Sequence, residues 1–332
     1  MANRYELAYI YARVCGALAR TWNAQRIGEL ARNGKLSDAW RAIFEEAPPA
    51  LPEGALVDAA ERRAIRGAFD EYKSLVDHLQ GEEPFFSALR RKAEFARVKR
   101  VMLALRGREA ACPESDDPSL APGFSPEAYP DVEKMFSGGR YGWIAKESLA
   151  DIAGTENRLD RQYYEELWAS LMTVRPSQRG GTPALVLLEL ELSNVVWAQR
   201  LARYYGMEAE RIRPLLVELP GRDLVSAALE GAAKRADRRG DWAGWKYEFL
   251  LGEDAGAWML DVRGLELAAH RHLYARIKRT LHLNPFTYTP LYCFFKLKEF
   301  ETVTVLSLFE GISLGAPEEE ITYLAPSGGG VA

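Results

Sequence analysis

Residues 290–321 read PLYCFFKLKEFETVTVLSLFEGISLGAPEEEI, and they carry one copy of a pattern, Glu-[Phe/Leu]-x-x-Val, that the chain repeats. Apolar residues recur here at three- and four-residue intervals, and a proline stands where a first helical turn tolerates it, so the stretch predicts a helix over 289–310. A helix this apolar is expected to be mainly buried. Its predicted core residues are Phe294, Leu297, Val305 and Leu308.

Two earlier copies of the pattern occur at similar intervals along the chain. Each copy follows a proline by eight to ten residues and falls in a predicted helix. Glu191 lies 97 residues after Glu94 and 108 residues before Glu299 in a chain of 332 residues, which predicts triplication of one helical unit. A Gly-Glu-Ile element follows the second and third copies only. The copies consist of Glu94, Phe95 and Val98; Glu191, Leu192 and Val195; and Glu299, Phe300 and Val303.

The predicted domains follow this spacing. A chain of this length is expected to contain two or three structural units. The Pro-rich stretch 110–130 is the clearest loop, and the Gly-rich end is an expected flexible tail. The predicted boundaries are 1–115 for the first repeat, 116–221 for the second, 222–325 for the third and 326–332 for the tail.

Helical periodicity extends over nearly the whole chain, and strand signals are almost absent, so the predicted fold class is all-α. Long helices of this kind favour a scaffold. The other predicted helices are 4–20, 22–33, 36–45, 57–80, 85–107, 130–137, 145–152, 159–172, 184–205, 208–218, 222–237, 241–251, 254–261 and 264–279.

Composition narrows the classes of partner. The chain is 48% hydrophobic and 27% charged, which is ordinary for a globular protein. Because 43 basic and 47 acidic residues nearly balance, nucleic acid is not an expected partner and no polybasic patch for anionic lipid is predicted. Protein partners fit this composition better.

Three widely spaced cysteines suggest neither a disulfide framework nor a zinc site, so a reducing cytosol is the expected compartment. The first residues contain charges where a signal peptide needs an apolar region, and no stretch approaches 18 uncharged apolar residues. The expected localisation is therefore cytoplasmic, without a transmembrane segment.

Catalytic, cofactor and metal sites are not predicted. The chain has four histidines, and His270 and His272 point to different sides of a predicted helix. Asp116-Asp117 lies in the Pro-rich loop without a second acidic cluster. The glycines of 138–142 follow no predicted strand, so they do not match a phosphate-binding loop. An enzyme is accordingly not expected.

The repeated glutamates have two interpretations. A carboxylate beside the same apolar pair in three units suggests one shared structural role, such as an ion pair on a helix surface or a bond to a neighbouring helix end. The alternative is an ion site made by three carboxylates on a pseudo-threefold axis.

Three further segments resemble the C subunit of archaeal and bacterial A/V-type ATPases, a relative of the d subunit of the eukaryotic vacuolar pump (the AC39 family). The family's order of Asn, Arg and Gly falls on Asn194, Arg200 or Arg203, and Gly206. Pro-Phe, Tyr and Lys-Glu of the last segment also match. The segments are LDRQYYEELW at 159–168, ELSNVVWAQRLARYYGMEAERIRPLLV at 191–217 and 284–321, and YIYARVCGAL at 9–18 resembles the family's opening helix.

The resemblance implies three pseudo-threefold related helical domains that form a funnel or socket without a catalytic site. It implies a rotor subunit that couples central-stalk subunits to the membrane proteolipid ring, for rotary ion transport or ATP synthesis. Such a subunit is a monomer within the complex and peripheral to the membrane. The alternative is a helical-repeat adaptor or scaffold protein of another complex.

Overall fold

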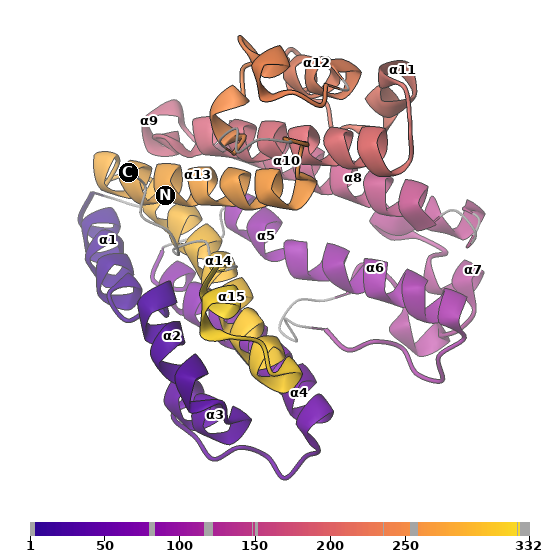
Figure 1. The fold of residues 1–332 in the computed structure, drawn as a ribbon. Coiled ribbons are helices and arrows are strands. Elements are labelled where there is room, and N and C mark those ends of the chain that lie inside the picture. The colour runs from indigo at the N-terminus through magenta and orange to yellow at the C-terminus, as the bar shows by residue number, and fades with distance from the viewer. Residues whose placement is uncertain are drawn as a thin grey trace. The chain divides into compact units, whose positions relative to one another are not determined.

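The computed structural model describes residues 4–79, 84–115, 122–147, 149, 152–234, 236–252, 258–323 and 325. Over these residues the regular structure is helical, and β-type pairing is limited to one bridge between Leu219 and Arg222. The all-α prediction is therefore confirmed for the described chain (Figure 1). The predicted tail 326–332 and the start of the helix predicted at 254–261 lie outside the described residues.

Fifteen α-helices occur in the described chain. They are α1 (Arg4–Leu18), α2 (Ala24–Asn33), α3 (Leu36–Phe44), α4 (Glu53–Val76), α5 (Pro84–Arg90), α6 (Lys92–Gly107), α7 (Val132–Met135), α8 (Ile152–Thr173), α9 (Pro176–Arg179), α10 (Thr182–Tyr204), α11 (Ala209–Ile212), α12 (Ser226–Lys234), α13 (Val262–Leu283), α14 (Thr289–Leu314) and α15 (Glu318–Tyr323). Short 3-10 turns are η1 (Pro126–Ala128), η2 (Gly139–Tyr141), η3 (Ile144–Lys146), η4 (Arg213–Leu215), η5 (Arg239–Trp242) and η6 (Glu248–Leu250).

The chain forms two compact units, each assembled from separate stretches. Unit 1 contains Met1–Gly81, Pro176–Leu185 and Arg263–Ala332, and unit 2 contains Glu82–Arg175 and Val186–Val262. This division follows packing, whereas the predicted repeats follow a sequence pattern. The threefold repeat therefore stays a prediction.

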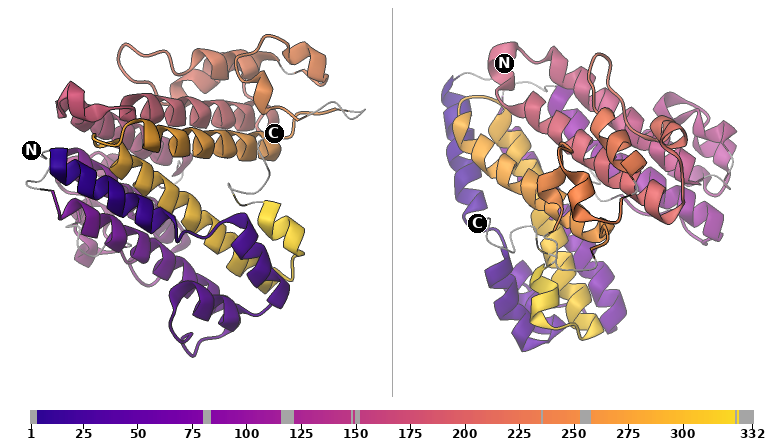
Figure 2. Two further views of the ribbon diagram at one scale, coloured as in Figure 1. Left: turned by 90° about the vertical axis from the view of Figure 1, so that its left-hand side faces the viewer. Right: turned by 45° about the horizontal axis from the view of Figure 1, so that its top comes forward.

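Unit 1 is built on α14. All four predicted core residues of this helix are buried, as its apolar sequence predicts: Phe294, Leu297, Val305 and Leu308. The most extensive helix contact in the unit is between α14 and α4, which run side by side (Figure 2). Tyr72 of α4 packs edge-on against Phe295 of α14, with ring centroids 5.0 Å apart. Aromatic burial of this kind makes α14 the central element of the unit.

A second cluster closes unit 1 around the C-terminal half of α14. Trp40 of α3 and Phe309 of α14 pack there with Ile27 of α2 and Ile321 of α15. Gly311 makes the approach of α15 possible, because a Cβ at this position would collide with the Ile321 side chain. Gly315 ends α14 with a φ of 66°, a left-handed conformation that suits glycine.

Unit 2 packs α5 and α6 against α8. The helix predicted over 85–107 is divided at Arg91 into α5 and α6. Phe95 of α6 is buried between the rings of Tyr141 and Tyr163, at 5.3 and 5.5 Å between centroids. The same aromatic contacts orient α6 so that its glutamate also faces the core.

The remaining part of unit 2 corrects one helix prediction. Residues 241–251 form two 3-10 turns instead of the predicted α-helix. Gly244 has a φ of 79°, which interrupts a right-handed helix. Trp242 and Trp245 pack edge-to-face at 5.0 Å between centroids, and the Trp245 indole donates to the Ala227 carbonyl at 2.8 Å. Burial of two indoles thus replaces helical hydrogen bonding here.

Candidate functional site

Glu94, in the first copy of the repeated pattern, is a buried carboxylate on α6. Its side chain Oε1 accepts a hydrogen bond from the Gly123 backbone N–H at 2.6 Å, and the residue is 5% exposed. The apolar members of this copy, Phe95 and Val98, are buried as well. Glu94 therefore ties the Pro-rich loop to helix α6 at Gly123.

Charges around Glu94 offset part of the cost of its burial. Glu166 of α8 pairs with Arg140 at 2.9 Å and with Arg91 at 3.4 Å. Burial raises the pKa of Glu94, whereas the positive charge of Arg140, the Gly123 hydrogen bond and Arg91 oppose this rise. Burial also raises the pKa of the nearby Tyr141 hydroxyl, and the charge of Glu94 adds to that shift.

The second copy lies on α10 within unit 2. Leu192 and Val195 are buried, and the carboxylate of Glu191 forms an ion pair with Lys246. Burial, with a further contribution from the charge of Glu191, raises the pKa of the adjacent Tyr247 hydroxyl. Glu191 thus connects α10 to the segment that carries Trp242 and Trp245.

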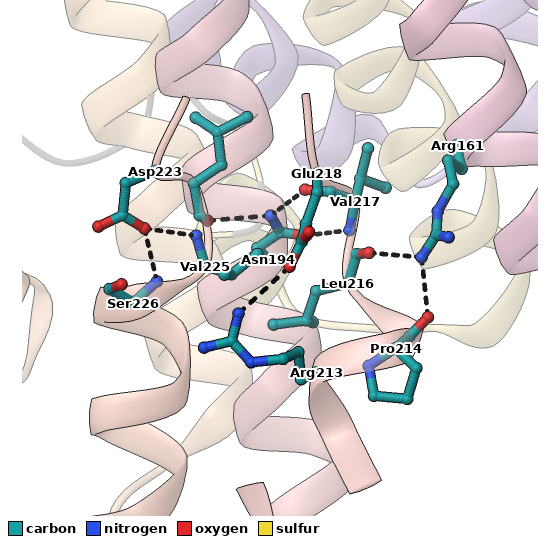
Figure 3. Close-up of polar contacts among 11 residues, drawn as sticks. Arg161, Asn194, Arg213, Pro214, Leu216, Val217, Glu218, Asp223, Val225 and Ser226 are labelled. Carbon is teal, nitrogen blue, oxygen red and sulfur yellow. Dashed lines mark hydrogen bonds and ion pairs between the residues drawn. The ribbon is translucent and has the colours of Figure 1, made fainter. Parts of the chain in front are cut away.

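Asn194, one turn further along α10, makes the most complete set of buried polar contacts in this region (Figure 3). Its Nδ2 donates to the carbonyls of Val217 at 2.8 Å and Leu224 at 3.0 Å. Its Oδ1 accepts from the Val217 N–H at 2.9 Å. One side chain therefore satisfies three backbone groups that enter the core, as buried polar groups require.

Two further side chains hold the same loop. Arg161 of α8 donates from Nη2 to the carbonyls of Pro214 at 2.8 Å and Leu216 at 3.0 Å (Figure 3). Asp223 accepts from the Ser226 N–H at 3.0 Å, which caps α12, and hydrogen bonds from Ser226 lower the pKa of this carboxyl. The segment between α11 and α12 is thus fixed by Arg161 of α8, by Asn194 of α10 and by its own Asp223.

The third copy, on α14 in unit 1, has a different environment. Glu299 pairs with Lys296 of the same helix at 2.5 Å. Phe300 is half-buried, with its ring 5.6 Å from that of Tyr274, and Val303 is 49% exposed. The apolar positions that are buried in the first two copies are therefore less buried in the third.

Residues beside the third copy make a partly buried ion-pair network. Lys298 pairs with Glu301 one turn along α14 and with Glu71 of α4 at 3.1 Å. Burial alone would lower the pKa of Lys298, but the two carboxylates outweigh burial and raise it. Glu301 also accepts a hydrogen bond from the Trp22 N–H at 2.8 Å. This network joins α4, α14 and the connection between α1 and α2.

The residue three positions after each glutamate makes a side-chain hydrogen bond, and the sequence pattern alone did not single out this position. Arg97 donates to the Pro113 carbonyl at 2.8 Å, and Asn194 donates to Val217 and Leu224, in both cases on the segment that follows the helix. Thr302 instead donates to the Lys298 carbonyl of its own helix at 2.9 Å. Two copies thus hold the chain that follows them, and the third does not.

These contacts are structural in character, because carboxylate, amide and guanidinium groups satisfy backbone groups or opposite charges. Over the residues that the structure describes, no three His, Cys, Asp or Glu side chains are placed to hold a metal ion. Within the same residues, no helix is both long and apolar enough to cross a membrane.

Comparison with known proteins identifies the class. Residues 10–323 match the family described as ATP synthase (C/AC39) subunit. The match spans nearly the whole chain and includes all three copies of the pattern. The chain therefore belongs to the ATP synthase (C/AC39) subunit family, whose members are subunits of V/A-type ATPases.

Individual relatives agree with this assignment. An uncharacterized protein of Treponema pallidum (strain Nichols) is 27% identical over 321 residues, which cover 93% of each chain. The C subunit of the A-type ATP synthase of Methanosarcina mazei is 24% identical over 194 residues, 57% of this chain and 52% of the relative. The corresponding protein of Methanosarcina barkeri is 22% identical over 194 residues, with the same coverage. The chain thus aligns with about half the length of these named proteins.

Proposed function

We propose that this protein is a non-catalytic rotor subunit of a V/A-type ATPase, a socket that couples the central stalk to the membrane proteolipid ring. The observation that carries the proposal is the family match over 10–323. It is supported by the two Methanosarcina relatives, although these align over only 57% of the chain. In this function the protein transmits torque and has no catalytic role.

The polar contacts described above support a role in transmitting torque. A spacer that transmits torque has to resist shear between its own helices. The Lys298 network joins α4 to α14, and Asn194 joins α10 to the loop before α12. Asn194 and Glu301 are buried, so water competes little with their contacts and truncating one partner leaves the other unsatisfied, whereas Glu71 is exposed.

We further propose that three related helical domains form the socket, with 1–115, 116–221 and 222–325 as repeats. Glu94, Glu191 and Glu299 would then occupy equivalent positions. Superposition of the α6, α10 and α14 regions in an experimental structure of the assembled complex tests this. Placement of the glutamates on non-equivalent helices would contradict the repeat.

Purification from native membranes tests the proposed partners. A tagged copy of the chain should be extracted together with a proteolipid ring and central-stalk subunits, in one complex at the cytoplasmic face. An adaptor of another assembly would bring a different set of proteins. Recovery of the chain with neither ring nor stalk would contradict the proposal.

A further inference from the structure

Unit 1 contains a solvent-accessible groove with a volume of about 790 Å³, and every residue that lines it belongs to this unit. Its floor is formed by α4 and α14, which run side by side. On α4 the floor consists of Ala64, Gly67 and Ala68, whose spacing of three and four positions puts them on one face of the helix. Because these side chains are short, the α4 backbone is open to a close approach. We call this feature the α4–α14 groove.

The packing of unit 1 does not require a glycine at Gly67. A Cβ at this position would lie 3.3 Å from Nη1 of Arg63, the movable end of a long side chain, and no other described atom outside the helix backbone stands within 4 Å. Gly311 differs, because a Cβ there would collide with Ile321. A glycine inside a helix is less favourable than alanine, but it permits another backbone to come close. Gly67 therefore leaves room for a segment outside the described chain.

Two arginines without an acidic partner line one end of the groove, where α1 connects to α2. The Arg26 guanidinium lies 4.0 Å from the centre of the Trp22 ring. Its Nη1 also donates to the Arg20 carbonyl at 2.9 Å, which fixes the position of the charge. Arg20 and Arg26 are exposed, and over the described residues neither forms an ion pair with a carboxylate. Both charges are thus available to an external carboxylate.

The carboxylates at the same end of the groove are already paired. Lys298 of α14 forms ion pairs with Glu71 and Glu301, and Glu301 also accepts from the Trp22 N–H. Lys298 and its two carboxylates together leave one negative charge, which the two arginines exceed. The end beside α1 is therefore positive on balance.

The opposite end of the groove, where α3 ends, is negative on balance. Arg63 lies 5.5 Å from the centre of the Phe44 ring and is neutralised by an ion pair with Glu46 at 3.2 Å. Glu45 lines the groove and is exposed, and its carboxylate has no partner among the described residues. Arg63 marks this end on α4, and Glu71 marks the other. Two helical turns separate them, so the ends lie about 12 Å apart along the helix.

We propose that the α4–α14 groove binds about two turns of a helix from a partner chain, with an acidic residue next to Arg20 and Arg26 and a basic residue next to Glu45. The short side chains of the floor admit the backbone of such a helix. The two ends of the groove complement opposite charges about seven or eight positions apart on it. Binding of a helix in a groove is a recurring mode of recognition between chains. The inference does not depend on which complex contains the protein.

Photo-crosslinking in the complex purified from native membranes identifies the occupant. A diazirine amino acid replaces Ala19, an exposed residue that lines the groove, in the full-length chain. The crosslinked peptide should come from another chain and carry an acidic and a basic residue about seven or eight positions apart. Arg66 is the matched control position, because it is exposed on the opposite face of α4. No crosslink from position 19 to another chain, or the same peptide from both positions, would overturn the proposal.

Gly67→Leu tests whether the partner reaches the floor of the groove. The added side chain fills the space above α4, so the crosslink from position 19 should fall at least about tenfold. Leucine favours a helix more than glycine does, so a thermal melt should show no loss of stability. Gly67→Ala adds one methyl group and should reduce the crosslink less. An undiminished crosslink in Gly67→Leu would contradict occupation of the floor.

Charge reversal at the two ends leaves the floor unaltered. Arg20→Glu and Glu45→Lys change exposed side chains without partners among the described residues, so circular dichroism should show unchanged folding. Each should lower the crosslink by about tenfold, and reversing the facing charge in the crosslinked peptide should restore it. Arg62→Glu, on the opposite face of α4, should have no effect. A similar loss in Arg62→Glu, or no recovery on reversal in the partner, would overturn the proposal.

The rotor assignment and the groove proposal fail separately. Co-purification with ring and stalk subunits reports the proposed function and does not depend on the groove. A chain that co-purifies with them but gives no crosslink from position 19 to another chain overturns only the groove proposal. A crosslink to a helix of the expected charge pattern in a protein that is not an ATPase subunit overturns only the rotor assignment.

Discussion

Asn194 and Val217 are joined by two hydrogen bonds in opposite directions, because Nδ2 donates to the Val217 carbonyl and Oδ1 accepts from the Val217 N–H. Asn194→Leu removes both, together with the bond to Leu224. Since each buried group left without a partner costs roughly 1–3 kcal/mol, we expect a loss of at least about 3 kcal/mol. Chemical denaturation followed by circular dichroism measures the change, and a loss below about 1 kcal/mol would contradict it.

Gln199 provides a matched comparison on the same helix. It is 1% exposed, and neither its Oε1 nor its Nε2 has a hydrogen-bond partner among the described residues. Gln199→Met keeps the shape and removes a buried amide without a protein partner, so the free energy of unfolding should stay the same or rise. A loss similar to that of Asn194→Leu would mean that a bound water satisfies Gln199.

Gly123→Ala should destabilise unit 2 through its contact with Glu94. A Cβ at this position would collide with the Glu94 carboxylate and crowd the Tyr141 ring, and overpacking of this kind costs about 1–3 kcal/mol. In the Glu94→Ala background the collision with the carboxylate is absent, so the added methyl group should cost less. A double-mutant cycle measures this coupling, and additive effects of the two substitutions would contradict the contact.

Glu94→Gln should alter how stability depends on pH. Burial raises the folded-state pKa of Glu94 above its ordinary value of 4.5, so the folded protein retains this proton to higher pH than the unfolded chain. This contribution to the free energy of unfolding is therefore greatest below the ordinary value and is lost as pH rises through the folded pKa. The advantage of the unaltered protein over the Gln variant should shrink over that interval. An advantage that grows with pH would contradict the assignment.

The three valines of the repeated pattern should respond differently to truncation. Val98→Ala and Val195→Ala remove buried methyl groups and should each cost about 2 kcal/mol. Val303→Ala, at a position that is 49% exposed, should change the free energy of unfolding by less than about 0.5 kcal/mol. Thermal melts of the three variants under one set of conditions test the difference. Equal losses would show that Val303 is enclosed.

Sequence reasoning was most successful where one periodic pattern fills a long helix. The predicted helix 289–310 corresponds to α14. Its four predicted core residues are buried, because apolar residues cover most of this helix and turn it into the core. Prediction was weaker where short segments meet. Arg91 separates α5 from α6 without a proline or glycine to mark the break, and aromatic packing replaces the helix expected over 241–251.

The partners in the polar contacts could be identified only from the fold. The pattern drew attention to Glu94 and Glu191, but their partners Gly123 and Lys246 lie 29 and 55 residues away in sequence. No local periodicity links such positions. Asn194 was named from the family resemblance, and its part in holding Val217 and Leu224 depends on a loop whose course follows from tertiary packing.

Reconstitution of the ATPase with and without this chain tests the central proposal most directly. We expect complexes that lack the protein to leave the proteolipid ring in the membrane and to release the catalytic head, which still hydrolyses ATP but drives no ion transport. Adding the purified protein back should restore ATP-driven transport. Transport that proceeds at full rate without the chain, or a head that remains coupled to the ring in its absence, would contradict a role in coupling the stalk to the ring.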